Sequence, residues 1–162
     1  MAILEIKKYP DPILRKRCEE VEEITEEIKK ITQDMIETNR KNGGIGLAAV
    51  QIGVLRRIIV IEAKDGSKVF INPTILEKTK ERNIGEEGCL SFPGLFLKIK
   101  RAKEVELEAL NLEGGEIRIR TSGLIARVIQ HEIDHLDGIL FVDRIGFWQR
   151  LQIRKRIKQL VP

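Results

Sequence analysis

The stretch GLIARVIQHEIDHLDG, residues 123–138, decides the fold. Ser122 precedes it as a helix-capping residue, and its last two residues, Asp-Gly, are a helix stop signal. We therefore predict a helix over residues 123–136. Positions i and i+4 of a helix lie on one face, so the imidazoles of His131 and His135 can reach one metal ion. This helix is the centre of the predicted structure.

The histidine pair predicts a metal site. The chain contains only two histidines, they are four residues apart, and Glu132 directly follows the first of them. A lone histidine is usually a satisfied structural residue, whereas the pattern HExxH on a helix is typical of metal hydrolases. In that pattern the glutamate acts on a metal-bound water without binding the metal itself. We therefore expect His131 and His135 as ligands and Glu132 as the base.

A third protein ligand is needed, because catalytic zinc sites usually present three and leave one position for water. The only acids after His135 are Asp137, which lies too near the helix end, and Asp143, which precedes the basic tail. Cys89 lies upstream among small residues at an expected strand end, and a thiolate is a strong ligand for a soft or borderline metal. We predict that Cys89 is the third ligand, and we interpret Cys18, in a charged run, as an inert buried thiol.

The segments around this helix indicate an α+β fold. Strands are expected at residues 57–62, 68–72, 104–109 and 117–119, and further helices at 11–17, 25–42 and 146–160. The strands form a block between helices and do not alternate with them. We therefore predict antiparallel or mixed β-sheets around a central metal-binding helix, with a C-terminal helix.

Composition limits the class of protein. The chain has 162 residues, which predicts one domain over residues 1–162. Its 42% apolar and 33% charged residues exclude a disordered chain and a membrane protein. The N-terminus has no apolar signal core, so we expect a cytoplasmic protein with no membrane contact and with reduced cysteines.

The C-terminal tail is basic. From residue 144 onwards it contains no acid and six of the cations, namely Arg144, Arg150, Arg154, Lys155, Arg156 and Lys158. Such a segment is a candidate contact for an anionic partner, and a solvated helix face explains it equally well.

A glycine-rich segment, GGIGLAAVQ (residues 43–51), lacks the Lys-Ser/Thr of a phosphate-binding loop. Its small residues allow close approach of the backbone, and Gln51 contributes an amide donor. A tightly packed turn and strand is the alternative interpretation.

Together three segments resemble the peptide deformylase family. They are GIGLAAVQ (44–51), EGCLS (87–91) and QHEIDHLDG (130–138), and the resemblance runs from YPDP (9–12) to the basic tail. It implies a hydrolase of protein biosynthesis that removes the formyl group from N-formylmethionine of nascent polypeptides and releases formate. It also implies that Cys89, His131 and His135 hold one divalent metal ion, Fe²⁺ in the cell, which Zn²⁺, Ni²⁺ or Co²⁺ can replace.

The resemblance further implies roles in the reaction. Glu132 takes a proton from the metal-bound water and later delivers it to the leaving amine. The side-chain amide of Gln51 and the backbone N–H of Leu90 stabilise the charge on the formyl oxygen. Main-chain groups of Ile45 and Gly46 anchor the peptide as an added strand.

Other implied positions concern the surroundings of the site. Leu124 and Val128 are the candidates for the wall of the methionine pocket, and Phe96 replaces an arginine that better-known bacterial members carry at the rim. Glu87 and Arg101 are expected to form an ion pair behind the metal loop. The basic C-terminal helix is expected to contact ribosomal RNA near the nascent-chain exit.

Two rival functions remain open from the residues alone. An HExxH endopeptidase would take its third ligand downstream, which fits this chain poorly. A metal-stabilised adaptor whose basic helix binds RNA would have four protein ligands and would leave Glu132 without a role.

Overall fold

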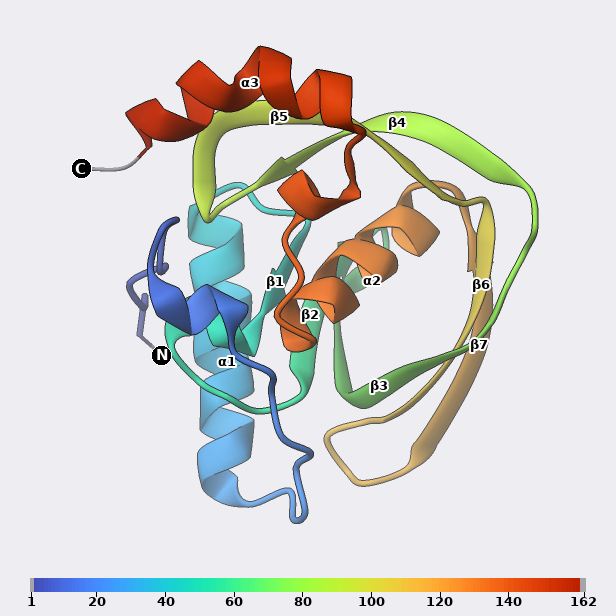
Figure 1. Ribbon diagram of the computed structural model, residues 1–162. Coiled ribbons are helices and arrows are strands. Elements are labelled where there is room, and N and C mark those ends of the chain that lie inside the picture. Colours follow the sequence, from blue (N-terminus) through green and yellow to red (C-terminus); the bar gives the residue numbers. More distant parts are fainter. Residues whose placement is uncertain (1, 161–162) are drawn as a thin grey trace.

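Residues 2–160, which the computed structural model describes, form two antiparallel sheets that lie around helix α2 (Figure 1). The elements in chain order are η1 (Pro12–Arg15), α1 (Glu26–Lys41), β1 (Gly46–Ala48), η2 (Ala49–Ile52), β2 (Ile58–Ala63), β3 (Gly66–Lys78), β4 (Arg82–Cys89), β5 (Phe92–Ala102), β6 (Glu104–Leu110), β7 (Glu116–Ser122), α2 (Gly123–Leu136), η3 (Phe141–Arg144) and α3 (Phe147–Gln159).

The larger sheet has the strand order β1-β2-β3-β6-β7, and β4 and β5 form the second sheet. The predicted α+β class, with antiparallel sheets around a central helix and a C-terminal helix, is therefore confirmed. The expected strand at 68–72 is only the first part of β3, which continues to Lys78 through two shifts of register against β6. Because β1 is an edge strand, one side of it is free of a partner strand within the described residues.

The larger sheet is covered on both faces by helices. Ile59 of β2 packs with Ile129 of α2, whereas its neighbours Ile58 and Val60 pack with Met35 of α1. A strand buried on both faces is continuously apolar, which explains the run RIIVIE at residues 57–62.

The sequence analysis assigned no strand to residues 92–102, and this was its main omission. In β5 the buried Leu95, Leu97 and Ile99 alternate with exposed residues, a period of two that is typical of a strand with one wet face. Its partner β4 is rich in glycine and charge, and it offers little apolar pattern of its own. The pairing with β5 therefore holds β4 in place.

Helix ends agree closely with the expectations. Thr25 caps α1 through its side chain, and Asp11 caps η1 in the same way. Ser122 occupies the capping position of α2, but its side chain accepts no capping hydrogen bond.

Cys18 is buried, and burial raises the pKa of its thiol to about 11, which agrees with an inert thiol.

The C-terminal helix packs through a narrow apolar strip. Ile153 is buried, and Ile157 and Leu160 join the same apolar cluster as Leu95 and Leu97 of β5. Among the described residues, no helix combines the length and apolar character that crossing a membrane requires.

Candidate metal centre

The three predicted ligands come together although they belong to different elements. Cys89 is the last residue of β4, and both histidines lie on the inner face of α2. One ligand atom from each of Cys89, His131 and His135 lies within 4.8 Å of the other two, and the Cys89 Sγ to His135 Nε2 distance is 3.3 Å. Neighbouring ligand atoms of a tetrahedral site with bonds of about 2.0–2.3 Å lie roughly 3.5 Å apart. The donor set therefore fits a metal ion.

A buried carboxylate orients the first histidine. The Nδ1 atom of His131 lies 2.8 Å from Glu87 Oε1, and both side chains are almost fully buried. With Nδ1–H donating to the carboxylate, the Nε2 lone pair is free to bind a metal, which is the usual carboxylate–histidine arrangement of metal sites.

Their surroundings shift the pKa values of the two imidazoles in opposite directions. Burial opposes the charged form of His131, but hydrogen bonds with Cys89 and Glu87 outweigh this and raise its pKa. Burial, together with the nearby charge of His131, lowers the pKa of His135. Because only neutral imidazole binds metal, a raised pKa means that metal binding to His131 competes with proton binding.

The downstream acids do not reach the site. Asp137 pairs with Arg57 at 2.7 Å, and Asp143 pairs with Arg15. Neither carboxylate belongs to the cluster of possible metal ligands. Cys89 therefore fits the role of third ligand better than either acid.

Glu132 follows His131 on α2, and its carboxyl lies against Gly46 of β1. Its side chain is almost fully buried, and its Oε2 atom has no hydrogen-bond partner among the described residues. Burial raises the pKa of Glu132 to about 7, and the positive charges of His131 and Arg101 reduce the shift only in part. A carboxyl group with a pKa near the working pH can both accept and release a proton.

A glycine of the first motif makes room for this carboxyl. A Cβ atom on Gly46 would lie 2.6 Å from Glu132 Oε1 and 2.7 Å from Val128 Cγ1. The close approach of β1 to α2 therefore requires glycine at this position, and it places the main chain of Gly46 beside the catalytic candidate.

Gln51 is held with its amide nitrogen toward Cys89. Its Oε1 atom accepts from the Ala48 N–H at 2.9 Å, and its Nε2 atom donates to Ser91 Oγ at 3.0 Å and lies 3.6 Å from Cys89 Sγ. The bond from Ala48 to the oxygen and the bond from the nitrogen to Ser91 together fix which atom of the amide faces the cysteine. Leu90 directly follows Cys89, and its side chain lies against Gly44 of the first motif.

Three of the side chains expected near the substrate are apolar and exposed, namely Phe96, Leu124 and Ile45. Phe96 is 59% exposed and lies against Gly88, next to Cys89. Leu124 is 57% exposed and lies one helical turn before the buried Val128. Ile45 is also exposed, but its carbonyl oxygen already accepts from the Glu62 N–H at 2.8 Å.

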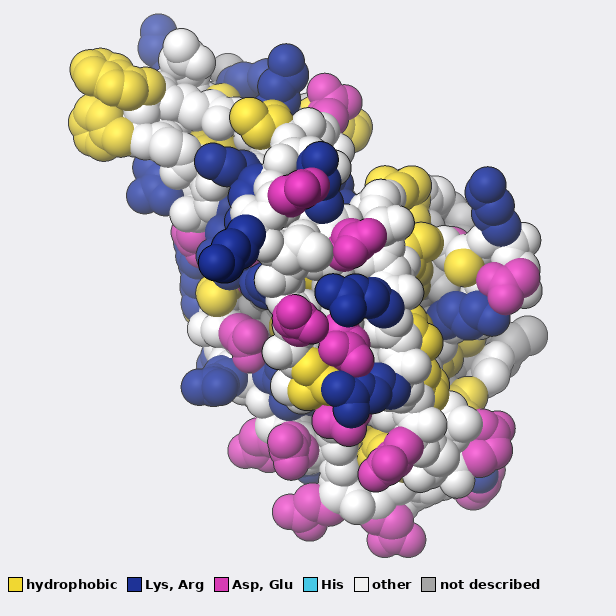
Figure 2. Space-filling model, turned by 90° about the vertical axis from the view of Figure 1, so that its right-hand side faces the viewer, with side chains coloured by type: hydrophobic (Ala, Val, Ile, Leu, Met, Phe, Trp, Pro, Cys, Tyr) yellow, Lys and Arg dark blue, Asp and Glu magenta, His cyan; other side chains and the backbone are white. Residues whose placement is uncertain are grey.

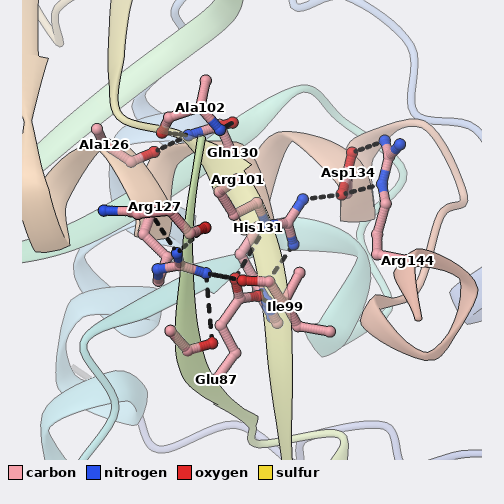
Figure 3. A network of polar contacts seen from close by, with 12 residues as sticks. Glu87, Ile99, Arg101, Ala102, Ala126, Arg127, Gln130, His131, Asp134 and Arg144 are labelled. Atoms are coloured by element: carbon pink, nitrogen blue, oxygen red, sulfur yellow. Dashed lines mark hydrogen bonds and ion pairs between the residues drawn. The ribbon is translucent and has the colours of Figure 1, made fainter. Parts of the chain in front are cut away.

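A network of buried charges supports the site from behind (Figure 3). Arg101 donates to both oxygens of Glu87 at 2.9 Å and to Asp134 at 2.6 Å, so the expected ion pair of Glu87 and Arg101 is confirmed. Arg144 donates to Asp134. Arg144 therefore belongs to the network and is not a free cation of the tail. Arg127 also donates to Glu87 at 2.8 Å.

The sequence analysis missed Asp134 and Arg127. A usable signal existed for Arg127, since it is a charged residue in an apolar stretch of helix, four positions before the predicted ligand His131. Its partners on β4 and β5 could not be named, because those strands were not both predicted.

The pKa of Glu87 predicts a loss of stability in acid. Burial would raise this pKa, but hydrogen bonds from His131 and Arg101 outweigh it and lower the pKa from 4.5 to about 2. A carboxyl whose pKa is lower in the native state stabilises that state fully at a pH above its pKa in the unfolded chain. The free energy of unfolding should therefore fall by about 3 kcal/mol as the pH falls from 4.5 to 2. Urea unfolding of the metal-free protein across this range measures it, with Glu87→Gln as the reference. A free-energy difference between the two proteins that does not change with pH would contradict the assignment.

Comparisons with known proteins agree on one family. The family described as polypeptide deformylase matches residues 3–150. Peptide deformylase 1 of Clostridium perfringens is 50% identical over 145 residues, which cover 88% of this chain and 98% of the relative. The peptide deformylase of Thermodesulfovibrio yellowstonii is 47% identical over 163 residues, 98% of each chain. The crystal structure of peptide deformylase from Thermotoga maritima has a TM-score of 0.88 at 42% identity, covering 90% of this chain and 99% of the other.

Proposed function

Because this chain belongs to the peptide deformylase family of enzymes, we propose that it hydrolyses the formamide bond of N-formylmethionine on nascent polypeptides by a metal-assisted mechanism and releases formate. The observation that carries this proposal is the cluster of one thiol and two imidazoles beside a buried carboxyl without a partner. One domain, residues 1–162, would perform the reaction.

Cys89, His131 and His135 would hold the ion, and three protein ligands leave a fourth position for water. When bound, a divalent ion lowers the pKa of that water and polarises the formyl carbonyl. We propose Fe²⁺, with Zn²⁺, Ni²⁺ or Co²⁺ able to replace it, since one thiolate and two imidazoles suit each of these ions.

Glu132 moves the protons of the reaction. Its Oε2 atom accepts a proton from the attacking water and later gives it to the leaving nitrogen, as base and then acid. Because the pKa of Glu132 is about 7 in the metal-free protein, its carboxyl can both accept and donate a proton near neutral pH. Because the side chain is almost fully buried, bulk water has little access to the proton while Glu132 holds it.

Gln51 and Leu90 would stabilise the negative charge that grows on the formyl oxygen. The amide nitrogen of Gln51 is already oriented toward Cys89 by the Ala48 N–H and Ser91. A donor that is fixed before the reaction needs no rearrangement, which is why such donors matter for rate. The backbone N–H of Leu90, next to Cys89, would be the second donor.

The substrate peptide would lie along the open edge of β1. The carbonyl of Ile45 is occupied by Glu62, so the remaining main-chain groups of Ile45 and Gly46 would anchor it. Leu124 and Val128 would contact the methionine side chain, and Phe96 would form an apolar rim in place of a charged one.

A formate-release assay on formyl-Met peptides tests this function. Anaerobic protein with Fe²⁺ should release formate, a chelator should abolish the activity, and added Ni²⁺ or Co²⁺ should restore it. Air should inactivate the Fe²⁺ form, because oxygen attacks both Fe²⁺ and a thiolate ligand. Formate release that survives complete metal removal would contradict the proposed role of the cluster, and cleavage of internal peptide bonds would favour an endopeptidase.

We also propose that α3 contacts ribosomal RNA. Arg154, Lys155, Arg156 and Lys158 are exposed, and no carboxylate of residues 2–160 forms an ion pair with them. Figure 2 shows several Lys and Arg side chains at the top, the end that α3 covers in Figure 1, and others down the middle of this face, whereas Asp and Glu predominate at the bottom.

The contact predicts a strong dependence on salt. With four phosphate contacts, affinity for ribosomes should fall roughly 100-fold between 50 and 200 mM salt, since each contact releases a counterion. Replacing the four cations by glutamine should remove this dependence and leave activity on short peptides unchanged. Sedimentation binding at several salt concentrations measures it, and binding that does not respond to salt would count against the contact.

A further inference from the structure

We propose that Arg127 is a positioning residue of the metal centre, which joins the strand that carries Cys89 to the helix that carries both histidines. This inference rests on the proposed function for the identity of the site. It concerns a side chain that neither touches the metal ligands directly nor belongs to any of the three sequence motifs.

The guanidinium group contacts both strands of the second sheet. From α2, Nη1 donates to Glu87 Oε2 and to the Ile99 carbonyl, each at 2.8 Å. Nη2 donates to the Asn83 carbonyl at 3.1 Å and to its Oδ1 atom at 2.8 Å. Four acceptors on two strands require a planar group with several fixed donors, which among side chains only arginine offers.

The contacts follow one face of β4. Asn83, Gly85 and Glu87 alternate along the strand, so they share the face that α2 covers. Gly85 lies in the middle of this face, and a Cβ atom there would lie 3.0 Å from both Cζ and Nε of Arg127. Glycine therefore allows the guanidinium to lie flat against the strand that ends at Cys89.

The same carboxylate connects Arg127 to a metal ligand. Arg127 and His131 are one helical step apart, and they contact the two different oxygens of Glu87. Arg101 also contacts Glu87, but one of its nitrogens donates to Asp134 instead. Arg127 thus holds in place both the carboxylate that orients His131 and the strand that presents Cys89.

Three variants that disturb the guanidinium contacts to different degrees distinguish positioning of the metal ligands from a contribution to stability alone. Arg127→Met keeps the length but removes every donor, and Arg127→Lys keeps the charge without the planar fork. Gly85→Ala keeps the arginine and pushes its guanidinium by a few tenths of an ångström. The matched control is Arg118→Met, because Arg118 forms one ion pair with Glu106 on the exposed part of the large sheet.

The readouts are the affinity for Co²⁺ by competition with a chelator and the thiolate-to-Co²⁺ absorption band in the near ultraviolet. Both are measured at a temperature at which circular dichroism shows each variant folded. Arg127→Met should lose about 10–100-fold in affinity and weaken the thiolate band, as is typical for loss of a group that supports a ligand. Arg127→Lys and Gly85→Ala should show smaller losses, and Arg118→Met none.

Wild-type affinity and an unchanged thiolate band in Arg127→Met would overturn the inference, even if that variant melts at a lower temperature. If Arg127→Met does not fold, wild-type affinity in both Arg127→Lys and Gly85→Ala overturns it. The proposed function fails separately, when wild-type protein binds Co²⁺ through its thiolate and releases no formate. Wild-type protein that binds no Co²⁺ would contradict both proposals.

Discussion

Replacing Glu132 by glutamine is expected to lower the rate of formate release by roughly 10²–10⁴-fold while the metal stays bound. Glutamine has the same shape, so it should fill the buried space beside Gly46 without disturbing the three ligands. It cannot take up the proton of the attacking water. The measurements are the turnover number on a formyl-Met peptide and the metal content after gel filtration.

Glu86→Gln is the matched control, because Glu86 is exposed on β4 and should not affect turnover. In an adaptor with a structural metal, neither substitution would change the binding function. Undiminished formate release by Glu132→Gln would remove this residue from the mechanism.

The same variant has a signature in stability. In the metal-free protein the pKa of Glu132 is raised from 4.5 to about 7, so the native state binds its proton more tightly than the unfolded chain does. The ionised carboxyl therefore destabilises the native state increasingly as the pH rises from 4.5 to 7. The stability of Glu132→Gln relative to the wild type should increase over this range.

Arg101→Met is expected to cause the largest loss of stability, about 3–5 kcal/mol. Methionine keeps most of the buried volume, but it removes three donors and leaves Glu87 and Asp134 with fewer partners away from water. For a chain of this size such a loss should lower the melting temperature by roughly 6–20 °C. Scanning calorimetry of the metal-free protein measures it.

Arg118→Met serves again as the control, since an exposed ion pair contributes about 0–1 kcal/mol. The three ligands remain in Arg101→Met, so metal should still bind, with lower affinity because Glu87 is held less firmly. If Arg101→Met melted within a degree of the control, the buried network would be irrelevant to stability.

The bounds of helix α2 were predictable, from Ser122 before its first residue and from the stop signal after residue 136. Cys89 was inferred because a site with two histidines lacked a ligand, and the structure brings its sulfur within 3.3 Å of His135. The predicted grouping of these three side chains depends on local geometry and on the coordination chemistry of metals, whereas their role as ligands stays a prediction.

The second sheet was harder to foresee. A glycine-rich, charged strand such as β4 has little propensity of its own, and β5 holds it by pairing. Without both strands, nothing in the chain indicated that Arg127 would find Asn83, Glu87 and Ile99.

Local spacing and side-chain chemistry are therefore enough to predict the α+β class of this chain and the three residues of its possible metal site. Contacts between segments far apart were settled by the packing of two sheets around one helix. Such packing sets the distance between a sulfur and an imidazole 46 residues later, and it decides which buried charges meet. The physical reason is that periodicity acts over a few residues, whereas burial and charge pairing depend on where the whole chain excludes water.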